Sequence, residues 1–284
     1  MSGHEPSRGE VFHLVDVRLD NPRGGPPLVA GANLGVARGE VVLVVGAAGA
    51  GTSRLVAAAL GEVRLDNGQL DVLGRDVSKL RRSSLRLLRR RIGIVPQDLC
   101  LLEDRSVQLN VVLPLEIDGI PRSASVVRAA LALTRLGLDA EASLPVDCLS
   151  SSARQRVAVA RALVRDPELV IADHPTSMQD EEGAELVCGA LADAARRGAA
   201  CLVFGRDPTL RAIAERNGWR QLGLVGGVLS PLAEMELVGR SIEDVLVEFD
   251  FGSEPVPLHS VPDPEIPNVI AFPTTARTVA GGVG

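Results

Sequence analysis

Short apolar runs rich in β-branched residues recur along the chain, and longer amphipathic stretches separate them. The apolar runs predict buried strands at 39–46, 92–95, 168–173 and 198–205. Weaker patterns predict further strands at 11–19 and 68–76 and a closing hairpin at 218–230. Helical periodicity is found at 79–91, 122–139, 151–165, 181–197 and 208–216. Buried strands that alternate with helices predict an α/β fold whose sheet is covered on both faces.

The pattern changes near residue 231, where we place a domain boundary. Residues 1–230 carry the alternation of strands and helices, and residues 231–284 form a C-terminal extension. In this extension, "SIEDVLVEF" predicts a short amphipathic helix. The proline-rich sequence that follows predicts a flexible, partly disordered tail.

Charge and cysteine content narrow the class of protein. The 284 residues carry a formal net charge of −6, which argues against a nucleic-acid partner. No apolar run reaches about 18 residues, and the N-terminus lacks the pattern of a signal peptide, so we expect a cytoplasmic location. The cysteines lack the spacing of a metal site and are expected to be buried free thiols: Cys100, Cys148, Cys188 and Cys201.

A glycine-rich turn, "GAAGAGTS" at 46–53, joins a predicted strand to a predicted helix. A phosphate-binding P-loop has this arrangement, with Gly, four residues, then Gly-Lys-Ser/Thr. Gly46 and Gly51 match that pattern, and Ser53 stands at the position of the metal-binding hydroxyl. Thr52 stands where the pattern has lysine. The turn alone is therefore weak support for a nucleotide site.

Other motifs follow in the order and spacing of a known family. "LSSSARQRVAVARALVRDPELVIADHPTSMQD", residues 149–180, resembles the block of ABC-transporter ATPases that reads LSGGQ, QRVAIARAL, DEPTS and SALD. "IGIVPQD" at 92–98 resembles their Q-loop. "LLEDRSVQLNVVLPLEIDG" at 101–119 looks like the branch that holds FtsE and the lipoprotein-release and macrolide-export ATPases. The resemblance covers roughly residues 11–230.

This resemblance implies a RecA-like core with an antiparallel β subdomain and a helical subdomain at about 98–165. It implies ATP bound at a P-loop made of Gly46, Ala47, Ala48, Gly49, Ala50, Gly51, Thr52, Ser53 and Arg54. Ser150, in the signature, would face the γ-phosphate across a dimer. Ser53, Gln97 and Asp173 would hold Mg²⁺. Asp173, His174 and Gln97 would be catalytic, with Arg206 at the switch position.

Several of these positions depart from the family pattern. Thr52 removes the lysine charge, and losing one partner of a desolvated charge pair costs about 2–5 kcal/mol, roughly thirtyfold to several thousandfold in affinity. His174 replaces the catalytic glutamate, and "FGRD" places Arg206 at the switch histidine. Ser151 and Ser152 replace two signature glycines, which adds a Cβ where backbone approaches phosphate. No adenine-stacking aromatic residue precedes the loop.

These changes spare the apolar scaffold, so the first hypothesis is a pseudo-ATPase subunit with weak or absent ATP binding. It would dock on a membrane permease of an FtsE-like or lipoprotein-export-like complex, at the inner face of the membrane. The docking wall would run from Gln97 to Glu116, and the subunit would form a homodimer or a heterodimer with another ABC ATPase. The alternative is an active transporter ATPase. A third reading is a soluble scaffold without a membrane partner.

Overall fold

The computed structural model describes residues 9–46 and 49–237. The chain divides into two compact units, residues 1–250 and 251–284, and the second lies outside the described residues. The predicted helix at 241–249 and the predicted tail also lie outside them. A domain boundary near residue 230 stays a prediction. Within the described ranges, no helix combines the length and apolarity needed to span a bilayer.

The central sheet of the described chain has six strands in the order β10-β9-β3-β8-β7-β6. Only β10 is antiparallel to its neighbour; the other pairs are parallel. The strands are β3 (Val41–Gly46), β6 (Ile92–Val95), β7 (Leu169–Asp173), β8 (Ala200–Phe204), β9 (Arg220–Val225) and β10 (Val228–Pro231). Every residue of β3, β7 and β8 is buried, which explains their continuous apolar runs.

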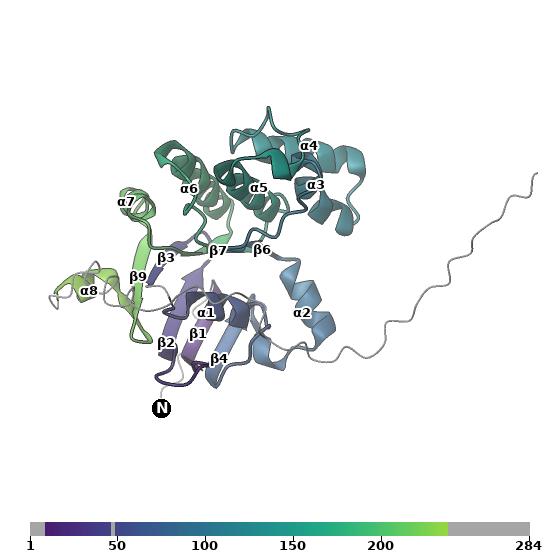
Figure 1. The fold of residues 1–284 in the computed structure, drawn as a ribbon. Helices are drawn as coiled ribbons and strands as arrows, with labels where there is room; N and C mark the ends of the chain where they lie inside the picture. The colour runs from purple at the N-terminus through teal and green to yellow at the C-terminus, as the bar shows by residue number, and fades with distance from the viewer. Residues whose placement is uncertain (1–8, 47–48, 238–284) are drawn as a thin grey trace, which may run out of the picture. The chain divides into compact units, whose positions relative to one another are not determined.

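Two hydrophobic clusters cover the two faces of this sheet. Along β3, Val41, Leu43 and Val45 pack into one cluster, and Val42 and Val44 pack into the other. Figure 1 shows α5 and α6 on one side of the sheet, and α1 with the second sheet on the other. Helices that contact the central sheet include α1 (Thr52–Ala59), α5 (Ser151–Leu163) and α6 (Glu181–Arg196), and α7 (Pro208–Arg216) packs against α6.

The second sheet is antiparallel and confirms the predicted β subdomain. Its order is β2-β1-β4-β5, with β1 (Glu10–Leu19), β2 (Val29–Ala37), β4 (Asn67–Val72) and β5 (Arg75–Asp76). The sequence pattern did not predict β2, because two glycines and three alanines weaken its alternation. Pairing with β1 therefore determines that this segment is a strand, since β2 runs antiparallel to β1 along most of its length.

The helical region predicted at about 98–165 contains α3 (Val107–Ile117), α4 (Arg122–Thr134) and α5. Helix α3 lies in the stretch expected to form the docking wall, but its side chains Val107, Val111 and Val112 face inward, because each is at most 1% exposed. Leu102 differs, since it is 43% exposed. Val107, Val111 and Val112 are therefore core residues, and Leu102 is the one of these four side chains that a docking partner could contact.

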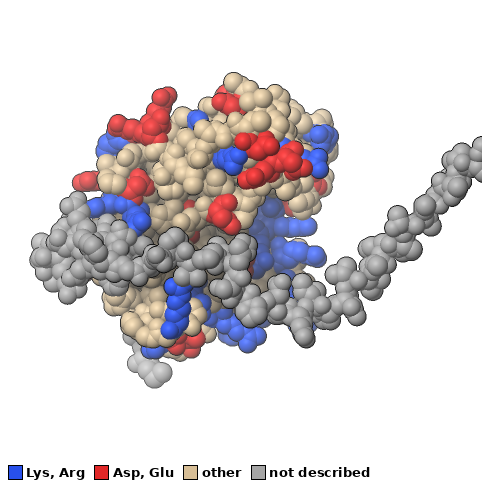
Figure 2. Space-filling model, in the orientation of Figure 1, with Lys and Arg blue, Asp and Glu red and all other residues tan. Residues whose placement is uncertain are grey.

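The basic stretch at 79–91 forms a short 3₁₀ turn, Val77–Lys79, and helix α2 (Arg82–Arg89). Figure 2 shows arginines gathered over α2. Leu88 packs in the core, whereas its neighbour Leu87 is 57% exposed. Helix α8 (Leu232–Leu237) follows β10 and ends the described part of the chain.

The cysteine prediction is half correct. Cys188 and Cys201 are buried free thiols, and burial raises the pKa of each to about 12. Cys100 and Cys148 are also free but exposed, so the expectation that all would be buried was wrong. Cys100 lies in the segment before α3, and Cys148 lies directly before the N-cap segment of α5.

Candidate functional site

The glycine-rich turn lies between the end of β3 and the start of α1, as the P-loop pattern predicts. Gly49 and Gly51 have φ values of 80° and 98°, in the left-handed region that favours glycine. A Cβ on Gly51 would lie 2.8 Å from Cβ of Leu28, so packing as well as backbone conformation requires glycine there. Ala47 and Ala48 lie outside the described residues. Ala50 packs against the hydrophobic cluster under the turn.

Helix α1 begins with the two residues that matter most for the P-loop prediction. Thr52 is 8% exposed, and its methyl group faces Gly46, where a Cβ would approach Cγ2 to 3.0 Å. Ser53 lies on the exposed side of the first turn. Arg54 is half-buried, and its Nε has no hydrogen-bond partner among the described residues. The first turn lacks acidic residues, so its N–H groups and the helix dipole favour an anion.

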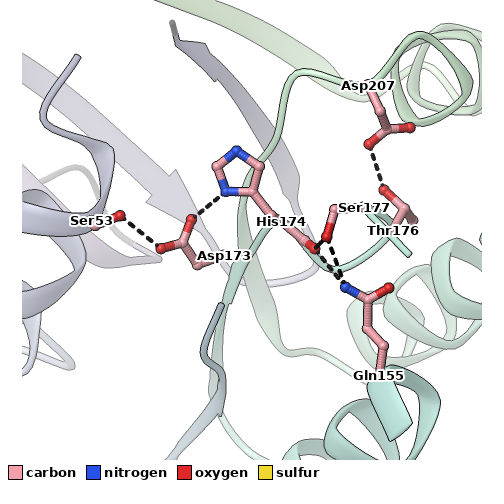
Figure 3. Close-up of polar contacts among 7 residues, drawn as sticks. All are labelled: Ser53, Gln155, Asp173, His174, Thr176, Ser177 and Asp207. Atoms are coloured by element: carbon pink, nitrogen blue, oxygen red, sulfur yellow. Dashed lines mark hydrogen bonds and ion pairs between the residues drawn. The ribbon is translucent and has the colours of Figure 1, made fainter. Parts of the chain in front are cut away.

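Asp173 ends β7, and its carboxylate contacts both Ser53 after the glycine-rich turn and His174 in the loop that follows β7. Ser53 Oγ donates to Asp173 Oδ2 at 3.1 Å, and Asp173 Oδ1 lies 2.8 Å from His174 Nδ1 (Figure 3). The Asp173 side chain is 6% exposed and that of His174 is 22% exposed, so the imidazole lies at the surface end of a buried carboxylate. The backbone of His174 has a φ of 52°, which is unusual for a residue with a bulky side chain.

The loop after β7 is fixed by polar contacts that the sequence analysis did not predict. Gln155 of α5 is 2% exposed and donates from Nε2 to His174 O at 2.8 Å. Thr176 Oγ1 donates to Asp207 Oδ2 at 2.7 Å, and both contacts are drawn in Figure 3. Gln155 was detectable, because a polar residue on the buried side of an amphipathic helix needs hydrogen-bond partners. Thr176 and Asp207 gave no comparable signal.

The remaining predicted site residues occupy separate segments. Gln97 is exposed in the turn after β6, and Arg206 is exposed directly after β8. Ser150 caps α5, where its hydroxyl accepts from Ala153 N–H at 3.2 Å. No contact joins these three to Asp173 or His174 among the described residues. The structure thus brings Ser53, Asp173 and His174 together and leaves the roles of Gln97, Arg206 and Ser150 as predictions.

The comparison with protein families agrees with this geometry. The family model described as "ABC transporter" matches residues 29–177, which include the turn, the signature segment and Asp173. The chain belongs to the ABC transporter family. Groups of three or more His, Cys, Asp or Glu side chains that could hold a metal ion are absent from the described residues.

Individual ABC relatives cover the same part of the chain. A methionine import ATP-binding protein of Mesorhizobium japonicum is 36% identical over 73% of this chain and 57% of its own length. A second one, from Burkholderia mallei, is 38% identical over 68% of this chain and 48% of its own length. The chain therefore spans about half the length of the curated relatives it matches.

A solved structure shows the same ABC fold. An ATP-binding cassette, dimeric and in a post-hydrolysis state with ADP and Pi, superposes with a TM-score of 0.70 at 25% identity. The match covers 78% of this chain and 98% of that structure. The predicted ABC fold is thus confirmed. The narrower resemblance to the FtsE and lipoprotein-release branch is not supported, because the relatives above are named for methionine import.

Proposed function

We propose that this chain is the ATP-binding subunit of an ABC transporter complex and that ATP binds at the turn between β3 and α1. One contact carries the proposal: Ser53 and Asp173, 120 residues apart in sequence, meet at 3.1 Å beside the free N-terminus of α1. This places a hydroxyl and a carboxylate where the anion-binding N–H groups of α1 begin. The family relatives, which are named as ATP-binding proteins, add support.

The residues present fit a magnesium ion. Ser53 supplies a hydroxyl oxygen and Asp173 a carboxylate, which are the hard oxygen donors that Mg²⁺ prefers. These two residues would hold the ion together with phosphate oxygens, and the ion would neutralise part of the phosphate charge. Gln97 remains a predicted further ligand.

Hydrolysis coupled to transport is the function that the comparisons favour. The post-hydrolysis cassette of the same fold held ADP and Pi. In this chain, the contact from Asp173 to His174 Nδ1 fixes the imidazole at 2.8 Å and leaves Nε2 as the atom that orients a water. His174 would thus take the position of the family's glutamate. Gln155 supports that role, because it holds the carbonyl of the same residue.

A second candidate is a subunit that binds nucleotide weakly and does not hydrolyse it. The specific observation that favours it is Thr52, which turns a methyl group to Gly46 and places no cation at the lysine position. Such a subunit would act by docking or by pairing with an intact ATPase. Both candidates share the permease as partner, a dimeric state, and a place at the inner face of the membrane. Methionine import is not carried over, because the membrane partner selects the transported molecule.

Phosphate release from Mg-ATP separates the two candidates. The purified chain, and the chain co-expressed with any ABC ATPase and permease encoded beside it, are compared with Asp173→Asn. Turnover that Asp173→Asn abolishes supports the transport ATPase. A rate at the buffer background that Asp173→Asn leaves unchanged supports the non-hydrolysing subunit. Failure to bind Mg-ATP in calorimetry at millimolar concentration would contradict ATP binding itself.

A further inference from the structure

Gln179, in the loop after β7, is hydrogen-bonded to the N-terminal part of α5. Its Nε2 donates to Ser152 O and to Gln155 Oε1, each at 2.9 Å, and its Oε1 accepts from Ser152 Oγ at 2.9 Å. We call Ser152, Gln155 and Gln179 the glutamine clasp. Every polar atom of the Gln179 side chain therefore has a partner on α5.

Gln155 extends the clasp along the whole loop. Its Nε2 donates to His174 O at 2.8 Å and to Ser177 Oγ at 3.2 Å. Its Oε1 also accepts from Met178 N–H at 3.1 Å. One buried side chain thus touches both ends of the segment from His174 to Gln179. Because a buried amide that loses its partners costs the full desolvation penalty, the loop and α5 favour a single relative position.

The surrounding packing leaves room for this arrangement. A Cβ on Gly183, in the first turn of α6, would lie 2.3 Å from Gln179 Oε1 and 2.9 Å from Asp180 Oδ1. Any larger residue there would push Gln179 away from Ser152. Asp180 itself caps α6 by accepting from Gly183 N–H at 2.8 Å. The glycine therefore serves the clasp and the cap together.

Two departures from the family pattern meet in the clasp. Ser152 stands at the second glycine of LSGGQ, and Gln179 stands at the leucine of SALD. Taken alone, Ser152 only crowds the signature. In the structure the Ser152 hydroxyl donates to Oε1 of Gln179. A leucine at position 179, as in the family pattern, would offer no such acceptor. The two substitutions therefore compensate each other. A segment that had lost its role would accumulate changes without such matched partners.

We propose that Ser152, Gln155 and Gln179 are positioning residues that hold the His174 loop and the signature end of α5 as one unit. Ser150 caps α5 and His174 begins the loop, so the clasp fixes the spacing between the two within one chain. A shift of α5 then carries His174 with it. The assignment of His174 and Ser150 to a nucleotide site rests on the proposed function, but the clasp itself does not.

Amide hydrogen exchange tests the clasp without nucleotide. The amide of Met178 is the direct probe, because it donates to Gln155 Oε1. Gln179→Leu and Ser152→Ala are each expected to speed its exchange about tenfold or more, since each opens the loop from α5. Gln221→Leu on β9 and Ser123→Ala on α4 are matched controls, because neither side chain makes a hydrogen bond among the described residues. Ser152→Thr keeps the hydroxyl and is expected to restore slow exchange.

A second readout separates positioning from general stability. The ring signals of His174 in ¹⁵N-histidine spectra are assigned with His174→Asn, and His13 on β1 serves as internal reference. Gln179→Leu is expected to shift or broaden the His174 signals and to leave those of His13 unchanged. Gln155→Leu is expected to have the same effect on the His174 signals. Its spectra are compared with the parent provided that thermal unfolding of the variant is cooperative. Unchanged exchange at Met178 and unchanged His174 signals in Gln179→Leu would overturn the proposal.

Failure of the proposed function is recognised separately. Both readouts above are recorded on the nucleotide-free chain, so they stand even if Mg-ATP does not bind. If Mg-ATP does bind, the clasp variants are expected to lower turnover and to leave the dissociation constant within about twofold of the parent. An equal loss in both quantities would mean that the clasp only stabilises the fold.

Discussion

Asn110 bonds to the backbone of Leu102 through both atoms of its amide. Oδ1 accepts from Leu102 N–H at 2.8 Å, and Nδ2 donates to Leu102 O at 3.0 Å. The same Nδ2 reaches Ser106 O at 3.1 Å, and Asn110 is 1% exposed on α3. Asn110 therefore attaches the segment after Gln97 to α3, and Arg161 of α5 also holds that segment by donating to the carbonyls of Leu99 and Cys100.

Replacing Asn110 is expected to destabilise this attachment. Asn110→Leu leaves the backbone groups of Leu102 without partners, so the free energy of unfolding should fall by about 2 kcal/mol. Urea denaturation followed by circular dichroism measures the change. Gln108→Leu on the same helix is the control, because the Gln108 side chain makes no hydrogen bond among the described residues. An Asn110→Leu variant as stable as this control would contradict the prediction.

The side chain of Leu102 tests the docking wall. It is 43% exposed, whereas Leu99 and Leu101 pack against the core, so Leu102→Asp should change the surface and spare the fold. If a permease helix docks there, Leu102→Asp is expected to abolish co-purification with the permease, because the charge must be desolvated at the interface. Leu131→Asp, at a 57% exposed position on α4, is the control. Co-purification that survives Leu102→Asp argues against this wall as the interface.

Thr52→Lys is expected to tighten Mg-ATP binding. The lysine restores a cation beside the phosphates, and a desolvated charge pair of this kind is worth about 2–5 kcal/mol, roughly thirtyfold or more in affinity. Calorimetry of the parent and the variant at the same salt concentration measures the difference. Thr52→Met, which has similar length and no charge, is the control. An equal gain with methionine would show that size rather than charge is responsible.

The ion pairs of Glu168 should make the free energy of unfolding depend on pH in a defined direction. Hydrogen bonds from Arg91 and Arg38 hold the pKa of Glu168 at about 2, below its ordinary value of 4.5. A depressed carboxyl pKa stabilises the fold above the unfolded-state pKa, and this contribution disappears as pH falls from about 4.5 through about 2. Because all three side chains are partly exposed, solvent screening limits the contribution to about 1 kcal/mol.

Glu168→Gln should therefore unfold at lower urea concentration than the parent at pH 7, by about 1 kcal/mol in free energy. The difference should stay constant down to about pH 5 and shrink below pH 4.5. Glu215→Gln is the control, because Glu215 is exposed on α7 and makes no ion pair among the described residues. A difference that grows as the pH falls would show that the sign of this linkage is wrong.

The sequence by itself determined the central sheet and the place of the glycine-rich turn. The strands β3, β7 and β8 are continuous apolar runs because both faces are covered, and that burial is visible in the residue pattern alone. The ABC family was recognisable because its motifs are local in sequence.

Only the tertiary structure decided which distant residues meet. Strand β2 exists because β1 pairs with it, although its own glycine-rich sequence favours no strand. Leu87 and Val112 are both apolar residues of predicted or observed helical segments. Leu87 is nevertheless 57% exposed and Val112 only 1% exposed, because other helices pack over α3 and not over this side of α2. The contacts of Ser53 with Asp173 and of Ser152 with Gln179 join segments far apart in the chain. Periodicity reports only local burial, whereas packing sets the distance between such segments.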